Sequence, residues 1–321
     1  MVRVLLLGAV HEAGLARLRA RPEVELVALD ETDEAGIDRD LPEADAVIVR
    51  TAPLPAAWIA RAPRLRVIAK HGVGVDNIDL AEASRRRIPV TVTATANATS
   101  VAEFAFAQLL ALAKSTRAWD EAVRAGDWAA RYHRTAVELA GKTLLVVGFG
   151  RIGARVAARA LAFEMRVLAY DPYVCAERIR AAGCTSVADL DAVLPEVDAV
   201  SLHCPSTPQT RGMFDAQRLA RLKPTAFLVN TARGGIVDEE ALARALRGGR
   251  LAGAALDVFA REPLPASDPL LGVPGLLLSP HVAGITAESA RRMALEAAEN
   301  LLAALDGRLD RSVVANPEVL A

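Results

Sequence analysis

The sequence predicts an α/β fold built from two parallel-sheet domains. Short apolar runs alternate with amphipathic, helix-like segments along nearly all of the chain, which is the pattern of parallel sheets covered by helices. A chain of 321 residues is long enough for two domains, each with its own core. A glycine-rich turn also stands between a strand-like and a helix-like run near the middle of the chain. We therefore expect both domains to be Rossmann-like or flavodoxin-like.

The first part of the chain carries five strand-like runs with helix-like segments between several of them. The strands are expected near 2–7, 24–29, 46–49, 67–70 and 90–93. Helices are expected near 12–20, 55–61 and 79–87. Ser100 and Glu103 have the spacing of a capping box, which predicts the start of a long helix that continues to about Lys114.

The second part repeats the alternation, and the chain then returns to the first. Strands are expected near 143–147, 166–170, 198–202, 225–230, 252–256 and 276–278. A last amphipathic helix near 286–306 is expected to pack on the first domain. The predicted domains are therefore 1–98 plus 286–321, and 99–285. Two such domains joined twice form a cleft, a frequent place for a small-molecule site.

Composition excludes several classes of protein. A net charge of −1 gives no general attraction to nucleic acid or anionic membranes. No apolar stretch approaches the roughly 20 residues needed to span a bilayer, and His11 and Glu12 interrupt the early apolar run. The three cysteines, Cys175, Cys184 and Cys204, form neither a metal-ligand pattern nor a paired framework. We expect a cytoplasmic protein without a metal site.

The glycine-rich turn is the strongest single motif. It consists of Gly148, Phe149, Gly150, Arg151, Ile152 and Gly153. The first glycine permits the tight turn, the second lets a pyrophosphate approach the backbone, and the third lets helix and strand pack closely. The first turn of the following helix favours an anion. A plain tight turn is the alternative.

Asp171 distinguishes these two interpretations. It ends the next strand-like run, 23 residues after Gly148, where a carboxylate would accept hydrogen bonds from an adenosine ribose. A plain turn leaves this acid unexplained, so we predict a dinucleotide site. The charge of Asp171 would repel a 2′-phosphate and favours NAD over NADP, although Arg151 and Arg178 leave NADP open.

Further motifs follow the later strands. Asn230-Thr231-Ala232-Arg233-Gly234-Gly235 brings an arginine to the ligand-binding edge of the sheet, and arginine is well shaped for two-point recognition of a carboxylate. Asp257, Glu262 and the segment Ser279-Pro280-His281-Val282-Ala283-Gly284 come next. With His71-Gly72-Val73-Gly74-Val75-Asp76-Asn77-Ile78-Asp79, they make the chain resemble the D-isomer-specific 2-hydroxyacid dehydrogenases. The similarity is to the branch of D-3-phosphoglycerate dehydrogenases and glyoxylate/hydroxypyruvate reductases.

The resemblance implies an NAD-dependent oxidoreductase whose active site contains Arg233, Glu262 and His281. His281 would exchange a proton with the C2 oxygen of the substrate, and Glu262 would favour the charged imidazole and orient it. Arg233 would bind the substrate carboxylate and polarise the C2 oxygen. Each residue alone could be structural: a loop histidine, a turn acid and a helix-entry cation.

The resemblance also implies further contacts. Domain 99–285 would bind NAD, and Asp257 would contact the nicotinamide carboxamide. Other cofactor contacts are expected from the glycine turn and Asp171, and from His203, Cys204, Pro205, Thr231, Ala232, Arg233, His281 and Gly284. We expect Cys204 to be a small buried hydrophobe rather than a reactive thiol.

Domain 1–98 plus 286–321 would bind the substrate, through Arg50, Lys70, Val73 and Gly74, together with Arg233 and His281. The N–H groups of Val73 and Gly74 form either a small anion nest or a plain glycine turn. Val49-Arg50-Thr51-Ala52 resembles a segment of the phosphoglycerate branch whose arginine lies near the phosphate, and Lys70 and His71 could add charge. Solvated surface cations are the alternative.

Two substrate pairs therefore remain open: 3-phosphoglycerate with 3-phosphohydroxypyruvate, and glycerate with hydroxypyruvate (or glyoxylate). The alternative of another class is a non-catalytic NAD-sensing protein of the same fold. The family is usually dimeric, so we expect a homodimer whose interface includes the segment around 100–140, with Trp119 and Trp128. A nucleic-acid partner is not expected, because the chain has no basic stripe.

Overall fold

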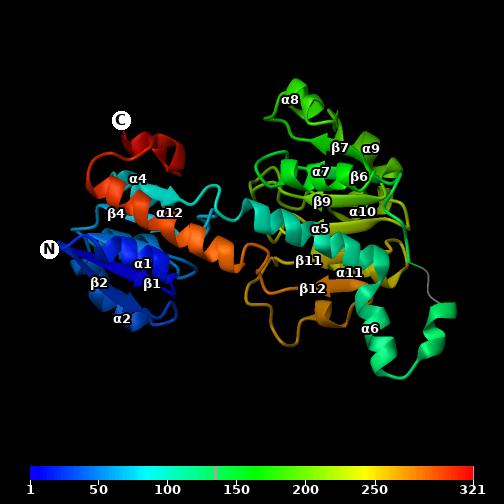
Figure 1. Cartoon of the computed structure of the whole chain (residues 1–321), viewed down its shortest axis with the longest axis horizontal. Coiled ribbons are helices and arrows are strands. Elements are labelled where there is room, and N and C mark those ends of the chain that lie inside the picture. Colours follow the sequence, from blue (N-terminus) through cyan, green and yellow to red (C-terminus); the bar gives the residue numbers. More distant parts are fainter. Residues whose placement is uncertain (134–135, 321) are drawn as a thin grey trace. The chain divides into compact units, whose positions relative to one another are not determined.

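The computed structural model describes residues 1–133 and 136–320. The chain forms two compact units (Figure 1). Unit 1 comprises Met1–Asn97 with Ile285–Ala321, and unit 2 comprises Ala98–Gly284. Unit 1 contains a five-stranded sheet and unit 2 a seven-stranded sheet. Every strand pairing in the two sheets is parallel. The predicted α/β fold with two parallel sheets is confirmed, whereas the cleft between them stays a prediction.

Unit 1 has the strand order β2-β1-β3-β4-β5, which is the flavodoxin-like order. Its strands are β1 (Val2–Leu7), β2 (Val24–Leu29), β3 (Ala46–Val49), β4 (Val67–Lys70) and β5 (Val90–Val92). One face packs on α1 (Glu12–Arg19) and α12 (Ala287–Leu305). The other face packs on α2 (Glu34–Asp40), α3 (Ala56–Ala60) and α4 (Leu80–Arg85). Both faces of the sheet are therefore buried, as its apolar strands require.

Unit 2 has the strand order β12-β11-β10-β9-β6-β7-β8, a Rossmann order extended by one strand. Its strands are β6 (Thr143–Val147), β7 (Arg166–Tyr170), β8 (Thr185–Ser186), β9 (Ala199–Leu202), β10 (Phe227–Asn230), β11 (Gly253–Leu256) and β12 (Leu276–Leu278). The sheet reverses its order between β6 and β9, and open α/β sheets bind ligands at the carboxyl ends of such strands.

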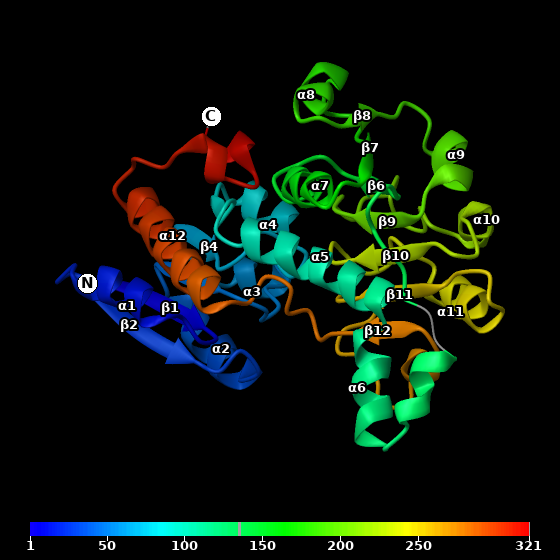
Figure 2. The same cartoon turned by 45° about the vertical axis from the view of Figure 1, so that its right-hand side comes forward.

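Helices cover both faces of the unit 2 sheet, and Figure 2 shows these layers. One face packs on α5 (Ala98–Lys114) and α7 (Gly153–Ala162). The other packs on α9 (Leu190–Val193), α10 (Ala216–Arg221) and α11 (Glu239–Arg247). Two further helices are α6 (Thr116–Arg124) and α8 (Ala176–Ala181). Short 3-10 helices are Leu41–Glu43, Trp128–Tyr132, Leu194–Glu196, Pro269–Gly272, Arg311–Val313 and Pro317–Leu320.

One predicted helix start is wrong. Helix α5 begins at Ala98, so Ser100 lies inside the helix, where it is only 4% exposed. The capping box instead stands at the start of α12, where the side chains of Thr286 and Ser289 each accept the other's backbone N–H. Strand β8 and helix α2 were not expected from the sequence, because both are short and lack a clear apolar period. No helix in the described part of the chain is long and apolar enough to cross a membrane.

Candidate functional site

The glycine turn lies at the switch point of the unit 2 sheet. Gly148 follows β6 with a φ of +91°, a conformation that favours glycine. A Cβ at this position would stand 2.7 Å from the carbonyl carbon of His203, which follows β9. The two neighbouring strands therefore end in direct backbone contact, and only glycine fits there.

The remaining glycines shape the entry to α7. A Cβ on Gly153 would stand 1.9 Å from the carbonyl oxygen of Gly148, so the helix can pack on the turn only without a side chain. A Cβ on Gly150 would meet nothing within 4 Å, which leaves open space over the backbone. Ile152, the N-cap of α7, offers no side-chain acceptor to the first-turn N–H groups. These N–H groups and the helix dipole suit a pyrophosphate.

Asp171 lies at the end of β7 and braces the same turn. Its Oδ2 accepts the N–H of Phe149 at 2.8 Å, and its Oδ1 accepts the N–H of Tyr173 at 2.9 Å. A carboxylate offers about four acceptor positions, so positions remain for the hydroxyls of a ribose. Asp171 thus holds the glycine turn in shape and can also receive a ligand.

Two buried polar atoms at the carboxyl edge of the same sheet find no hydrogen-bond partner among the described residues: His203 Nδ1 and Thr231 Oγ1. They stand just beyond the ends of β9 and β10. Burial lowers the pKa of His203 to about 3, so the ring is neutral, and its Nε2 lies 2.8 Å from Ser201 Oγ. Buried polar atoms are rarely left unpaired. With the open space at Gly150, these atoms fit a bound dinucleotide that completes their hydrogen bonds.

Cys204 follows His203 and is partly buried. Burial raises its pKa to about 11, and the nearby charge of Asp171 acts in the same direction. The thiol is therefore protonated near neutral pH, and a protonated thiol is a poor nucleophile. Pro205, the third residue of this segment, is exposed.

His281 and Glu262 form a hydrogen-bonded pair. His281 Nδ1 lies 2.7 Å from Glu262 Oε2, and the side chains are 52% and 36% exposed. Partial burial of the Glu262 carboxyl acts to raise its pKa. The hydrogen bonds from His281 and the Phe259 N–H, with the charges of His281 and Arg233, outweigh that effect and lower it. The carboxylate is therefore charged and oriented, and it leaves Nε2 as the ring atom facing away from it.

The loop that carries His281 is fixed by Asp257, which is 1% exposed. Asp257 Oδ1 accepts the Ser279 hydroxyl at 2.6 Å and the Val282 N–H at 2.9 Å, and Oδ2 accepts the Ala283 N–H at 2.8 Å. His281 itself has a φ of +54°, which costs a non-glycine residue about 1 kcal/mol. The carboxylate holds the loop in this conformation. Whether Asp257 also contacts the nicotinamide stays a prediction.

Arg233 is placed by the end of β10. The Asn230 side chain donates to the carbonyl of Arg233 at 2.9 Å and accepts the Ala232 N–H at 3.0 Å. The Arg233 guanidinium donates to the Ala232 carbonyl at 2.6 Å, and its charge acts on Glu262. In unit 2, Glu262 therefore hydrogen-bonds to His281 and is also acted on by the charge of Arg233, so the three predicted residues interact.

Gly234 is a site residue that the sequence interpretation missed. A Cβ on Gly234 would stand 1.8 Å from the carbonyl oxygen of Phe259 and 2.0 Å from its carbon. The backbone after Arg233 thus lies directly on the turn that leads to Glu262. The signal was present in the sequence as a glycine immediately after the arginine, but its contact partner lies 25 residues further along the chain.

The candidate substrate residues of unit 1 differ in their surroundings. Lys70 is 8% exposed and donates to Asn77 Oδ1 at 2.6 Å and to the carbonyl of Arg50. His71 is 7% exposed, and burial with the charges of Arg50 and Lys70 lowers its pKa to about 4. His71 therefore adds no charge near neutral pH, contrary to expectation.

The other unit 1 groups remain available. Within residues 1–133 and 136–320, the guanidinium of Arg50 makes no hydrogen bond or ion pair, and the N–H groups of Val73 and Gly74 donate none. Val73 is 39% exposed. An unpaired cation and two unpaired N–H groups suit an anion.

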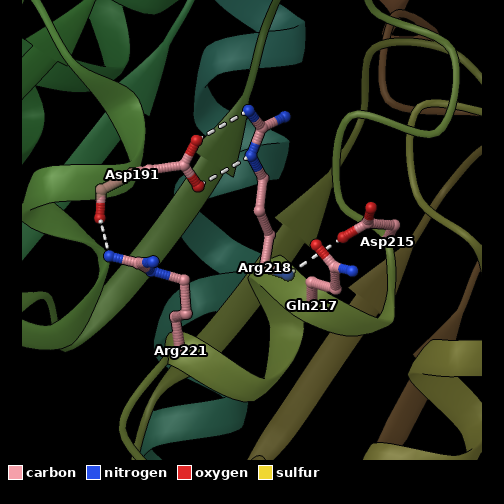
Figure 3. A pocket seen from close by; sticks show the side chains of 5 residues that line it. All are labelled: Asp191, Asp215, Gln217, Arg218 and Arg221. Carbon is pink, nitrogen blue, oxygen red and sulfur yellow. Dashed lines mark hydrogen bonds and ion pairs between the residues drawn. The ribbon is translucent and has the colours of Figure 1, made fainter.

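A hollow on the surface of unit 2 lies outside the predicted site (Figure 3). It is lined by Asp191, Asp215, Gln217, Arg218 and Arg221. Arg218 makes two hydrogen bonds to the Asp191 carboxylate, at 3.0 and 2.9 Å, and Arg221 donates to the Asp191 carbonyl at 2.9 Å. The charges of Arg218 and Asp191 therefore satisfy one another. In the described part of the chain, no three His, Cys, Asp or Glu side chains are grouped to hold a metal ion.

Known proteins resemble the chain in sequence and in fold. Residues 106–283 match the family model described as the NAD-binding domain of D-isomer specific 2-hydroxyacid dehydrogenases. A glyoxylate reductase of Korarchaeum cryptofilum is 40% identical over 324 residues, covering 99% of this chain and 97% of the relative. A D-3-phosphoglycerate dehydrogenase of Synechocystis is 39% identical over 318 residues, covering 99% of this chain but only 56% of the relative.

A solved structure is similar to this chain in fold as well as in sequence. The D-lactate dehydrogenase of Aquifex aeolicus, complexed with NAD and lactic acid, superposes with a TM-score of 0.88 at 32% identity. The match covers 98% of this chain and 99% of that one. The chain thus spans nearly all of two of these three relatives and little more than half of the third.

Proposed function

The chain belongs to the D-isomer specific 2-hydroxyacid dehydrogenase family, and we propose that it reduces hydroxypyruvate and glyoxylate to the corresponding 2-hydroxy acids. Membership makes it an NAD-dependent enzyme that interconverts a 2-hydroxy acid and a 2-oxo acid, rather than a non-catalytic NAD sensor. When bound, NADH supplies the hydride that reduces C2 of the 2-oxo acid. The observation that carries the proposal is the 2.7 Å pair of His281 and Glu262 within the field of Arg233.

His281 is the proton donor in this proposal. Its Nδ1 is held by Glu262, so Nε2 is the atom that delivers a proton to the C2 oxygen. The carboxylate stabilises the imidazolium before transfer and keeps the ring from turning. In the reverse direction, the neutral ring accepts the proton of the hydroxyl. Positioned proton transfer of this kind accelerates a reaction by roughly 10²–10⁴-fold.

Arg233 binds the substrate carboxylate and faces the oxygen on which negative charge develops. A guanidinium suits both tasks, because its planar fork recognises a carboxylate at two points and stays charged at every working pH. We propose that unit 1 also takes part in substrate binding, through the unpaired N–H groups of Val73 and Gly74, and that unit 2 binds NAD.

The unit 1 residues favour a small substrate without phosphate. Of the three unit 1 groups expected to supply positive charge, the buried Lys70 turns its ammonium group to Asn77 and the Arg50 carbonyl, and His71 is neutral near pH 7. Among these three, Arg50 is the group left to meet the far end of a substrate. The glyoxylate reductase of K. cryptofilum, similar over nearly its whole length, supports the same choice.

The second candidate is 3-phosphohydroxypyruvate. The unpaired guanidinium of Arg50 and the similarity to the Synechocystis D-3-phosphoglycerate dehydrogenase favour it. A panel of hydroxypyruvate, glyoxylate, pyruvate and 3-phosphohydroxypyruvate with NADH separates the candidates. We expect the highest kcat/KM for hydroxypyruvate or glyoxylate. A higher value for the phosphorylated acid establishes the second candidate, and turnover of none of the four contradicts both.

NAD is the cofactor of the enzyme, and we propose that Asp171 sets a preference for NADH over NADPH. Its carboxylate stands beside the glycine turn, where a 2′-phosphate would meet a like charge. The same assay with each cofactor tests this preference. Equal or higher kcat/KM with NADPH contradicts it.

We also propose that the enzyme is a homodimer that works in the cytoplasm. Helix α6 buries none of its residues, and Val123, Trp128 and Tyr132 nearby are 58%, 66% and 70% exposed. Such an apolar surface is typical of an interface. Arg134 and Thr135, in the same segment, lie outside the described residues. A light-scattering mass equal to that of one chain would contradict the dimer.

The cytoplasmic location is supported by the three free thiols, which suit a reducing compartment. Cell fractionation tests this location.

A further inference from the structure

The turn from Phe259 to Glu262 is held by two carboxylates. Glu262 Oε1 accepts the Phe259 N–H at 2.9 Å, which folds the turn back on itself. Glu239 Oε1 accepts the next N–H, that of Ala260, at 2.6 Å. Glu239 is the first residue of α11 and reaches this turn from a segment that begins just after Arg233. The two segments that carry Glu262 and Arg233 are therefore joined by a charge-assisted hydrogen bond.

Glu239 is not needed to cap its own helix. Asp238 is the N-cap of α11, and its side chain accepts the Ala241 N–H at 2.9 Å. The half-buried side chain of Glu239 instead reaches across to the turn 259–262, where it accepts the Ala260 N–H. Burial raises its pKa and the Ala260 N–H opposes this rise, while the charges of Asp268, Glu262 and Asp238 add to it. A carboxylate held among like charges costs free energy, and the bond to Ala260 offsets part of that cost.

A second contact joins the same two segments. Gly234 lies with its Cα against the carbonyl of Phe259, so close that any side chain would overlap it. This contact sets the distance between the segments but does not fix their relative rotation. The bond from Ala260 to Glu239 supplies that second restraint. Together the contact and the bond hold the turn 259–262 against the segment that follows Arg233.

We propose that Glu239 is a positioning residue of the active site, which locks the Phe259–Glu262 turn so that Glu262 can orient His281. The inference rests on the proposed function, in which His281 transfers the proton. Glu239 acts through Glu262 and touches neither substrate nor cofactor. Its acceptor oxygen is the essential feature, because the group it binds is a neutral N–H, and the charge only strengthens that bond.

Three variants test this role. Glu239→Ala removes the acceptor, Glu239→Gln keeps an oxygen in place without the charge, and Glu240→Ala is the matched control. Glu240 is the next residue of α11; its side chain is 89% exposed and its 3.4 Å partner is Arg244. We expect Glu239→Ala to lower kcat by about 10-fold or more, since small displacements of a catalytic group are costly. We expect Glu239→Gln and Glu240→Ala to stay within about 3-fold of the parent enzyme.

Two further measurements separate positioning from general damage. The Kd of NADH should be unchanged in Glu239→Ala, because the glycine turn and Asp171 follow other strands. Hydrogen exchange of the Ala260 amide should accelerate in Glu239→Ala and stay slow in Glu239→Gln. The proposal is overturned by a kcat for Glu239→Ala equal to that of Glu240→Ala. It is also overturned by equal losses in the Ala and Gln variants, or by a change in NADH affinity alone.

A parallel His281→Ala variant separates failure of the positioning role from failure of the proposed function. If His281→Ala is inactive and Glu239→Ala is normal, only the positioning role fails. If His281→Ala turns over normally, the proposed function itself fails.

Discussion

His281 is attached to Asp257 through the main chain as well as through the loop that follows it. The His281 N–H donates to the Asp257 carbonyl at 2.8 Å, and the buried Asp257 carboxylate accepts the N–H groups of the next two residues. A left-handed backbone at a histidine is stable only when its surroundings impose it. The position of the imidazole therefore depends on an acid at the end of the neighbouring strand.

Replacing Asp257 by asparagine should loosen this loop. Asparagine has an NH₂ group in place of one carboxylate oxygen. In either orientation this donor would face another donor, either the Ala283 N–H or the Ser279 hydroxyl and Val282 N–H. A buried donor would therefore be left unpaired. We expect Asp257→Asn to lower the free energy of unfolding by about 1–3 kcal/mol and to lower kcat at least about tenfold. Urea denaturation and steady-state kinetics measure the two effects.

The matched control for this substitution is Asp238→Asn. Asp238 caps α11, a position where asparagine serves about as well as aspartate. Its free energy of unfolding should change by less than about 0.5 kcal/mol. Similar destabilisation by both variants would show that Asp257 has no special part in holding the loop.

Gly234 should not tolerate even one methyl group. In Gly234→Ala the new Cβ would fall within 2.0 Å of two atoms of Phe259, so the backbone must move and carry Arg233 away from Glu262. We expect kcat to fall by about 10²-fold with little change in NADH affinity. Gly272→Ala is the control, because a Cβ there meets nothing within 4 Å. A kcat near the parent value in Gly234→Ala would refute the contact.

The sequence predicted the two parallel sheets and the positions of most of their strands. Apolar runs located the strands because parallel strands are buried on both faces, and the glycine turn, Arg233, Glu262 and His281 stood at their carboxyl ends. The predicted start of α5 at Ser100 was wrong, because the spacing of Ser100 to Glu103 is the same whether Ser100 caps a helix or lies inside one. The turn chemistry of a single segment cannot show which residue actually starts a helix.

Contacts between distant segments were beyond the sequence. Nothing near Lys70 indicates that its ammonium group would turn inward to Asn77 and the Arg50 carbonyl. Glu239 and Gly234 look like an ordinary helix start and loop glycine, because their partners lie in the turn 259–262. The roles of these two residues depend on which segments meet at the edge of the sheet. The sequence of a single chain does not specify which segments meet.

Burial of His71 should make the protein lose stability in mild acid. Its pKa is about 4 in the fold and 6.5 in an exposed histidine, so between these values the unfolded chain binds a proton that the folded chain does not. Stability therefore falls as the pH drops below about 6.5, by about 2 kcal/mol at pH 5. His71→Leu should remove this part of the loss. An unchanged difference between pH 7.5 and pH 5 in the variant would contradict it.

The cysteines should differ in reactivity. Cys204 stays protonated because burial raises its pKa to about 11, and burial raises the pKa of Cys184 as well. Cys175 is exposed. We expect iodoacetamide at pH 7.5 to label Cys175 first, as read by peptide mass spectrometry, with activity retained. Rapid labelling of Cys204 and loss of activity that NADH prevents would show a reactive thiol at the cofactor site.

The most direct test of the central claim is the turnover of His281→Ala. With NADH and the best 2-oxo acid of the panel, we expect kcat to fall by roughly 10²–10⁴-fold, while fluorescence titration gives an NADH Kd close to that of the parent enzyme. His11→Ala, at an exposed N-cap, should retain full activity. A kcat for His281→Ala within a few-fold of the parent value would contradict the assignment of His281 as the group that transfers the proton.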